Sequence, residues 1–168
     1  MTFQPQTPLH QGVKWSEDGS AIAFSSTARD GTHFDVWTCS LSSIISGTPD
    51  RKLVMSNEVP GYFLPQAYSD SHILVQRYVS VSDSTLLLIP SSGGDARTIA
   101  PSSPSTPAAI CCGRLWHSQG ALVGVVYASN EGSEFMTLRY YDLKEGKEKE
   151  IVGEKDVKWD VEVGTVQK

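Results

Sequence analysis

The chain repeats one local pattern three times, and this repetition restricts its fold more than any other feature. Each repeat opens with an aromatic residue and a polar turn, then continues with an apolar run, a polar loop and a second apolar run. The opening aromatics are Trp15, Tyr68 and Trp116, and a fourth opening follows at Trp159. They recur roughly every 50 residues, near the spacing of repeat proteins whose unit is a small sheet. The sequence therefore predicts three similar units and the beginning of a fourth.

The apolar runs are predicted to be β-strands. They are short, rich in β-branched and aromatic residues, and bounded by Gly, Asp, Ser and Pro. Asp18-Gly19 is a hairpin signal because glycine adopts a positive φ without steric cost. The paired runs of the three units are 21–26 with 34–41, 72–79 with 84–89, and 121–128 with 135–143. A shorter run follows each pair, at 51–55, 95–100 and 147–152, so each unit supplies about four strands, and no stretch predicts a helix of useful length.

Several runs are apolar on both faces, and the run at 84–89, which ends LLLI, is the clearest example. Strands in a sheet with one wet face alternate between apolar and polar residues, whereas sheets stacked face to face bury both sides. We therefore predict an all-β fold, a partial β-propeller of about three four-stranded blades plus the start of a fourth. The predicted blades span approximately 12–55, 60–100 and 108–152, with a stub at 156–168, in a single domain over 1–168.

Composition excludes several classes of protein. With 14 basic and 19 acidic side chains the net charge is −5, and no basic patch for nucleic acid is visible. No apolar stretch approaches the roughly 18–20 residues that span a bilayer, and the N-terminus lacks a signal-peptide pattern. Two of the three cysteines, Cys111 and Cys112, are adjacent, which disfavours a disulfide. We therefore expect reduced thiols and a cytoplasmic protein that binds neither nucleic acid nor membrane.

The sequence carries no motif for a cofactor or metal. Its four histidines show neither i, i+4 pairing nor an H-E-x-x-H motif, and no C-x-x-C or phosphate-binding glycine loop occurs. The pair Cys111-Cys112 near His117 has two interpretations. It supplies either a thiol nucleophile or two small hydrophobic residues within a strand, and we favour the second.

Longer strings resemble a known peptidase family. Segments 25–37, 77–89, 133–147 and 158–162 resemble, in the family's own order, successive propeller blades of prolyl oligopeptidase-type serine peptidases. The likeness is greatest to the acylaminoacyl-peptidase and dipeptidyl-peptidase-like branches. The resemblance implies a propeller that screens peptides entering an α/β-hydrolase domain whose serine lies in a G-x-S-x-G elbow. This sequence contains no such elbow, so no catalytic residue is carried over and we expect this chain to have no peptidase activity.

Two functional hypotheses follow. The first is the non-catalytic propeller portion of such a peptidase, a substrate gate or scaffold whose partners are a peptide or an α/β-hydrolase domain in a longer protein. The second is a stand-alone propeller module of the WD40 or TolB-like kind, whose W-S-x-D-G opening this chain shares. In that case the open blade faces bind another protein.

Four residues at strand ends are candidates for contact with a substrate or an interface. Arg29 and Asp30 lie in the predicted loop between the first pair of strands, and Arg77 and Tyr78 end the first strand of the second pair. Such residues can contact the carboxylate or backbone of a peptide, or they can form a solvated Arg–Asp network at the rim. The recurring aromatics are interpreted as blade packing rather than as an aromatic cage.

Overall fold

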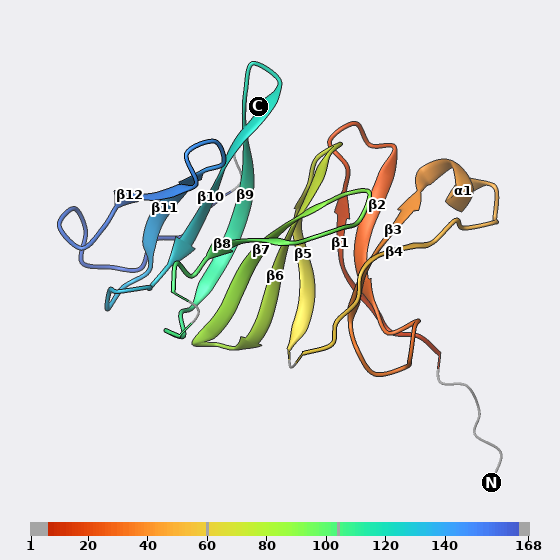
Figure 1. Ribbon diagram of the computed structural model, residues 1–168, viewed down its shortest axis with the longest axis horizontal. Coiled ribbons are helices and arrows are strands. Elements are labelled where there is room, and N and C mark those ends of the chain that lie inside the picture. Colours follow the sequence, from red (N-terminus) through yellow and green to blue (C-terminus); the bar gives the residue numbers. More distant parts are fainter. Residues whose placement is uncertain (1–6, 60, 104, 165–168) are drawn as a thin grey trace, which may run out of the picture.

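The computed structural model describes residues 7–59, 61–103 and 105–164, and the regular structure of this part is almost entirely β (Figure 1). Its strands form three antiparallel sheets of four strands each, and the strands follow chain order across each sheet. The all-β prediction and the prediction of three four-stranded units are therefore confirmed.

The first sheet consists of β1 (His10–Trp15), β2 (Ala21–Ser26), β3 (Asp35–Ser40) and β4 (Lys52–Met55). The predicted turn joins β1 to β2, and Gly19 in it has a φ of 73°. Asp18 holds this turn together by accepting hydrogen bonds from the Ser16 hydroxyl (2.7 Å) and the Ser20 amide (2.9 Å). The sequence thus fixes the first hairpin through local interactions.

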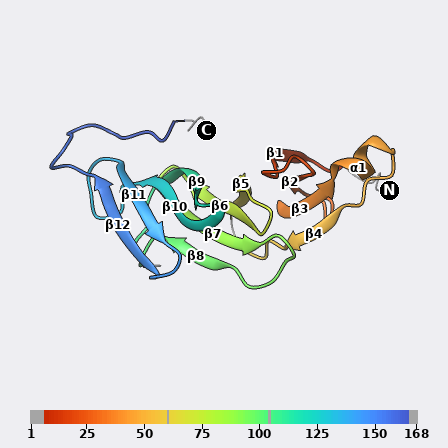
Figure 2. The same ribbon diagram turned by 90° about the horizontal axis from the view of Figure 1, so that it is seen from above.

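The second sheet consists of β5 (Tyr62–Tyr68), β6 (His72–Ser80), β7 (Asp83–Pro90) and β8 (Arg97–Ala100). The third consists of β9 (Ile110–Ser118), β10 (Ala121–Ser129), β11 (Thr137–Asp142) and β12 (Lys147–Val152). Figure 2 shows the three sheets side by side, with the first strands β1, β5 and β9 along one side of the molecule. The last strands β4, β8 and β12 lie along the other side.

The middle sheet is buried on both faces, as the apolar run of β7 predicts. Leu86 and Leu88 belong to a core shared with Val125 and Tyr127 of the third sheet. Leu87 and Ile89 belong to a core shared with the first sheet. Because successive side chains of a strand point to opposite faces, one strand supplies both cores.

Two features differ from the sequence-based expectation. A short helix, α1 (Leu41–Ile45), follows β3, with Ser40 as its N-cap. Five residues are too few to show a helical period in the sequence, and the Asp50 carboxylate holds the segment by accepting from the Ser40 amide at 2.9 Å. Residues 153–164 contain no strand, so the start of a fourth blade remains a prediction.

We expect that shortening a side chain in the core between the second and third sheets lowers the stability of the protein. Leu74 on β6 is completely buried in the core between the second and third sheets. Leu74→Ala is expected to lower the free energy of unfolding by about 2–5 kcal/mol, because a cavity replaces the packed side chain. Urea unfolding followed by tryptophan fluorescence measures the change. The control Val81→Ala, at a side chain that is 83% exposed, is expected to stay within about 0.5 kcal/mol of wild type. Equal effects of the two substitutions would contradict this description of the core.

Candidate functional site

All four sequence-predicted candidates lie at one end of the sheets. This loop end, the lower edge in Figure 1, is formed by the described residues of four loops, at 27–34, 56–59, 81–82 and 105–109. Arg29 and Asp30 lie in the first of these loops, while Arg77 and Tyr78 lie near the end of β6. The sequence could place these residues at strand ends, but which of them contact one another depends on tertiary structure.

Arg29 is the centre of an ion-pair network. Its Nε donates to Asp35 Oδ2 at 2.9 Å, and its Nη2 donates to the Asn57 carbonyl at 3.2 Å. The Asp35 carboxylate is completely buried and also accepts from the Asn57 amide at 2.7 Å. The hydrogen bond to Asp35 raises the pKa of Arg29 above its usual range. Arg29 therefore ties the loop after β2 to the loop after β4 and neutralises a buried carboxylate, a role that sequence reasoning did not assign to it.

Asp30 organises its own loop. Its carboxylate accepts from the amides of Thr32 (2.9 Å) and His33 (2.8 Å), and it lies 3.2 Å from Arg29 Nη2. Hydrogen bonds from the backbone and side chain of His33 are the main cause that lowers the pKa of Asp30. The expected Arg–Asp contact is thus present. Contact of either residue with a substrate or partner stays a prediction.

Arg77 lines a separate cavity of about 680 Å³, whose walls come from all three sheets and from the loop after β8. Its Nε is shielded from solvent and has no hydrogen-bond partner among the described residues. Neither Arg29 nor Asp30 lines this cavity. Tyr78 points to the opposite face of β6, because successive side chains of a strand alternate. The structure therefore separates the four candidates into the Arg29–Asp30 network, the Arg77 cavity and Tyr78.

A second cavity, of about 580 Å³, gathers the recurring aromatics Trp15, Tyr68 and Trp116 together with Arg114. Trp15 and Trp116 are about half exposed, at 57% and 48%. The interpretation of these two tryptophans as blade packing is therefore wrong. They lie on the first strands β1 and β9, and Val163 of the C-terminal segment also lines the cavity. Tyr68, by contrast, packs against the core between the first and second sheets, as expected.

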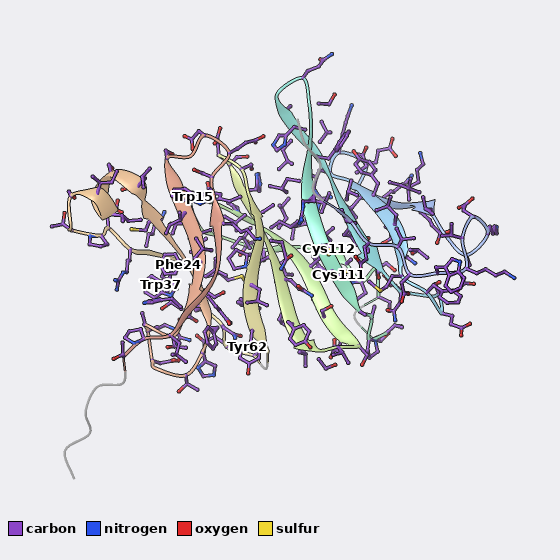
Figure 3. All side chains as sticks on the ribbon, turned by 180° about the vertical axis from the view of Figure 1, so that it is seen from behind. Trp15, Phe24, Trp37, Tyr62, Cys111 and Cys112 are labelled. Carbon is purple, nitrogen blue, oxygen red and sulfur yellow. The ribbon has the colours of Figure 1, made fainter. Side chains whose placement is uncertain are left out.

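The adjacent cysteines lie in β9, as the strand interpretation expects (Figure 3). Both are free thiols, and burial raises the pKa of Cys111 to about 12. A thiol with such a pKa remains protonated near neutral pH, which disfavours a role as nucleophile. Among the described residues, no group of three or more His, Cys, Asp and Glu side chains is arranged to hold a metal ion. The helix in this part of the chain, α1, is far too short to cross a membrane.

Comparison with known proteins identifies the fold. No protein-family model matches the sequence, and no curated protein matches it. Solved structures do match, at TM-scores of 0.59–0.62. They include an oligogalacturonate lyase solved in complex with manganese (14% identity, TM-score 0.61), TolB from Acinetobacter baumannii (16%, 0.59) and a prolyl endopeptidase (13%, 0.62).

These matches cover 88%, 85% and 83% of this chain, respectively, but only 43%, 32% and 21% of the matched chains. The chain thus spans less than half the length of each. Together with the three stacked four-stranded sheets, the matches identify the chain as a β-propeller fold whose sheets do not close into a ring. The fold that was predicted from the resemblance to prolyl oligopeptidase-type propellers is confirmed.

Removal of the Arg29 guanidinium is expected to destabilise the protein. Arg29→Met leaves the buried Asp35 carboxylate with the Asn57 amide but without a counterion. We expect a clear loss of stability, because the Asp35 carboxylate is completely buried and its removal from a counterion is unfavourable even though Arg29 itself is partly exposed. Urea denaturation at neutral pH measures the loss. The control Arg51→Met, at an exposed arginine, is expected to change stability by less than about 0.5 kcal/mol. A loss no larger than that of the control would refute the structural role of Arg29.

The Asp30 loop is expected to weaken in acid. Because the folded-state pKa of Asp30 is lowered, its contribution is complete above the unfolded value of about 3.9 and is lost as the pH falls through the folded value. The carboxyl carbon resonance of Asp30 should titrate with a midpoint clearly below about 3.9. Asp30→Asn should lose less stability than wild type between about pH 5 and pH 2, since it removes the titrating group. A midpoint at the ordinary value would show that the turn does not favour the charged form.

Proposed function

We propose that the chain is a non-catalytic propeller portion of a prolyl oligopeptidase-type serine peptidase, where it serves as a gate or scaffold for peptide substrates. The likeness to a prolyl endopeptidase, with a TM-score of 0.62 over 83% of this chain, carries the proposal. The four strings that resemble that family support it further. A cytoplasmic location is part of the proposal and is supported by the three free cysteines.

The outer face of the first sheet supports membership of a larger assembly. Ala23 and Val36 point from β2 and β3 into the core, so Phe24 and Trp37, which face each other across these strands, point outward (Figure 3). The Trp37 indole Nε1 is shielded from solvent and has no acceptor in the described part of the chain. The Trp37 side chain as a whole is only half-buried, so a further blade packed on this face would cover apolar surface that the described sheets leave partly exposed.

The arrangement of the sheets is also compatible with a gate. In a closed propeller the first strand of each blade borders the central channel, and here β1, β5 and β9 lie along one side (Figure 2). The cavity with Trp15 and Trp116 opens among these strands. Side chains of this size would narrow a channel and restrict the substrates that pass through it.

The alternative function is a TolB-like interaction module, whose exposed faces bind another protein. The likeness to TolB, with a TM-score of 0.59 over 85% of this chain, favours it. The two functions differ in a property that can be measured. Only the peptidase function requires a reactive serine on the same polypeptide as these blades.

A fluorophosphonate probe, which labels the serine of a G-x-S-x-G elbow covalently, distinguishes the two functions. Extracts of the cells that express the protein are labelled, denatured and immunoprecipitated with an antibody raised against the 168-residue chain. The peptidase function predicts a labelled polypeptide much larger than the 18.3 kDa of this chain.

Denaturation before precipitation ensures that only a covalently continuous polypeptide is recovered. Labelling after heat inactivation of the extract serves as the control and should give no signal. An unlabelled antigen would overturn the peptidase function and favour the TolB-like module.

A further inference from the structure

We propose that the Arg77 cavity binds the C-terminal carboxylate of a short peptide. The proposal concerns side chains of this chain alone, so it does not depend on the gate or scaffold function proposed above. It rests on a guanidinium without an ion pair in the described part of the chain, on an apolar wall that accommodates a side chain, and on a neighbouring carboxylate that selects among anions.

The guanidinium of Arg77 forms no hydrogen bond or ion pair with the side chains of the described residues. Arg77 lies on β6 between Phe63 of β5 and Thr85 of β7, and all three line the cavity. The described residues offer its Nε no acceptor, and this atom is shielded from solvent. An arginine remains charged at all ordinary pH values, and its planar fork of donors matches the two oxygens of a carboxylate. No ion pair of this guanidinium is present in the described part of the chain, so a carboxylate bound by its terminal nitrogens, rather than by the shielded Nε, would supply the missing counterion.

The walls of the cavity suit a small organic ligand. A volume of about 680 Å³ lies within the range of roughly 300–1,000 Å³ that is usual for small-molecule sites. The apolar part of the wall comes from strands of all three sheets and from two loops, and it includes Met55, Val59, Phe63, Leu87, Ile99 and Tyr141. Hydroxyl groups of Thr85, Thr98 and Ser105 supply a few polar contacts. An apolar surface with a small number of polar groups around one charge fits a terminal residue with an apolar side chain.

Two carboxylates also line the cavity, and they differ in their availability. Glu148 is already engaged, since its carboxylate lies 2.6 Å from Arg139 Nη1 and accepts from the Tyr127 hydroxyl. Asp83, at the start of β7, forms no ion pair in the described part of the chain. A carboxylate only accepts hydrogen bonds, so Asp83 favours a ligand that carries N–H donors beside its own negative charge. A peptide terminus has such donors, whereas a phosphate dianion would be repelled.

The test compares two peptides that differ only in the terminal group. N-acetyl-Gly-Leu with a free carboxylate and the same peptide as its C-terminal amide are titrated into the 15N-labelled 168-residue chain. The acid is expected to shift the amide resonances of Phe63, Thr85 and Thr98 saturably. The amide is expected to bind at least about tenfold more weakly, because a charge-assisted pair is replaced by a neutral contact.

Variants identify the residue responsible. Arg77→Met is expected to abolish the difference between acid and amide, while Arg51→Met, at an exposed arginine, should bind the acid as wild type does. Methionine has a similar length and no donor to leave unpaired, so Arg77→Met is expected to fold, and its 15N spectrum verifies this. If that variant does not fold, the comparison of acid and amide on the wild-type chain decides whether the cavity requires a terminal carboxylate.

Three outcomes of the peptide titrations would overturn the proposal. They are equal binding of acid and amide, absence of saturable shifts with the acid, and unchanged binding of the acid by a folded Arg77→Met variant. Inorganic phosphate, titrated in parallel, is expected to bind more weakly than the acid. Phosphate that binds as tightly as the acid would overturn the assignment to a peptide terminus.

Discussion

The burial of the middle sheet on both faces is the interaction on which the rest of the structure depends. Strand β7 contributes Leu86 and Leu88 to one core and Leu87 and Ile89 to the other. The first and third sheets pack mainly against this middle sheet. Their positions are therefore set by the middle sheet, in which β7 supplies side chains to both cores.

At the loop end, the surroundings of two arginine side chains, Arg29 and Arg77, give them different roles. The Arg29 guanidinium compensates the buried Asp35 carboxylate and joins two loops, so its charge is used within the fold. The Arg77 guanidinium lines a cavity and forms no ion pair in the described part of the chain, so its charge is not used within the fold in the same way. Sequence position alone does not separate these two arginines, because both lie near the end of the second strand of a sheet.

Strands and turns could be predicted from the sequence because they depend on local chemistry. The AIAFSS run became β2, the Asp18-Gly19 turn formed, and the apolar LLLI run was correctly assigned to a sheet buried on both sides. Helix α1 was not predicted, since its five residues carry no periodic signal. The exposure of Trp15 and Trp116 was not predicted either. An aromatic residue that recurs in each repeat indicates an equivalent position, but the neighbours that cover or expose it come from other strands.

The order of the sheets along the chain has a consequence for how the molecule responds to perturbation. Each sheet is built from consecutive strands and packs against the sheet before or after it, so the chain behaves as a short one-dimensional array with nearest-neighbour coupling. In such an array, damage at one end is transmitted only through the unit in between. The middle unit is thus the mechanical link of the array, while either terminal unit can loosen without destroying the core at the other end.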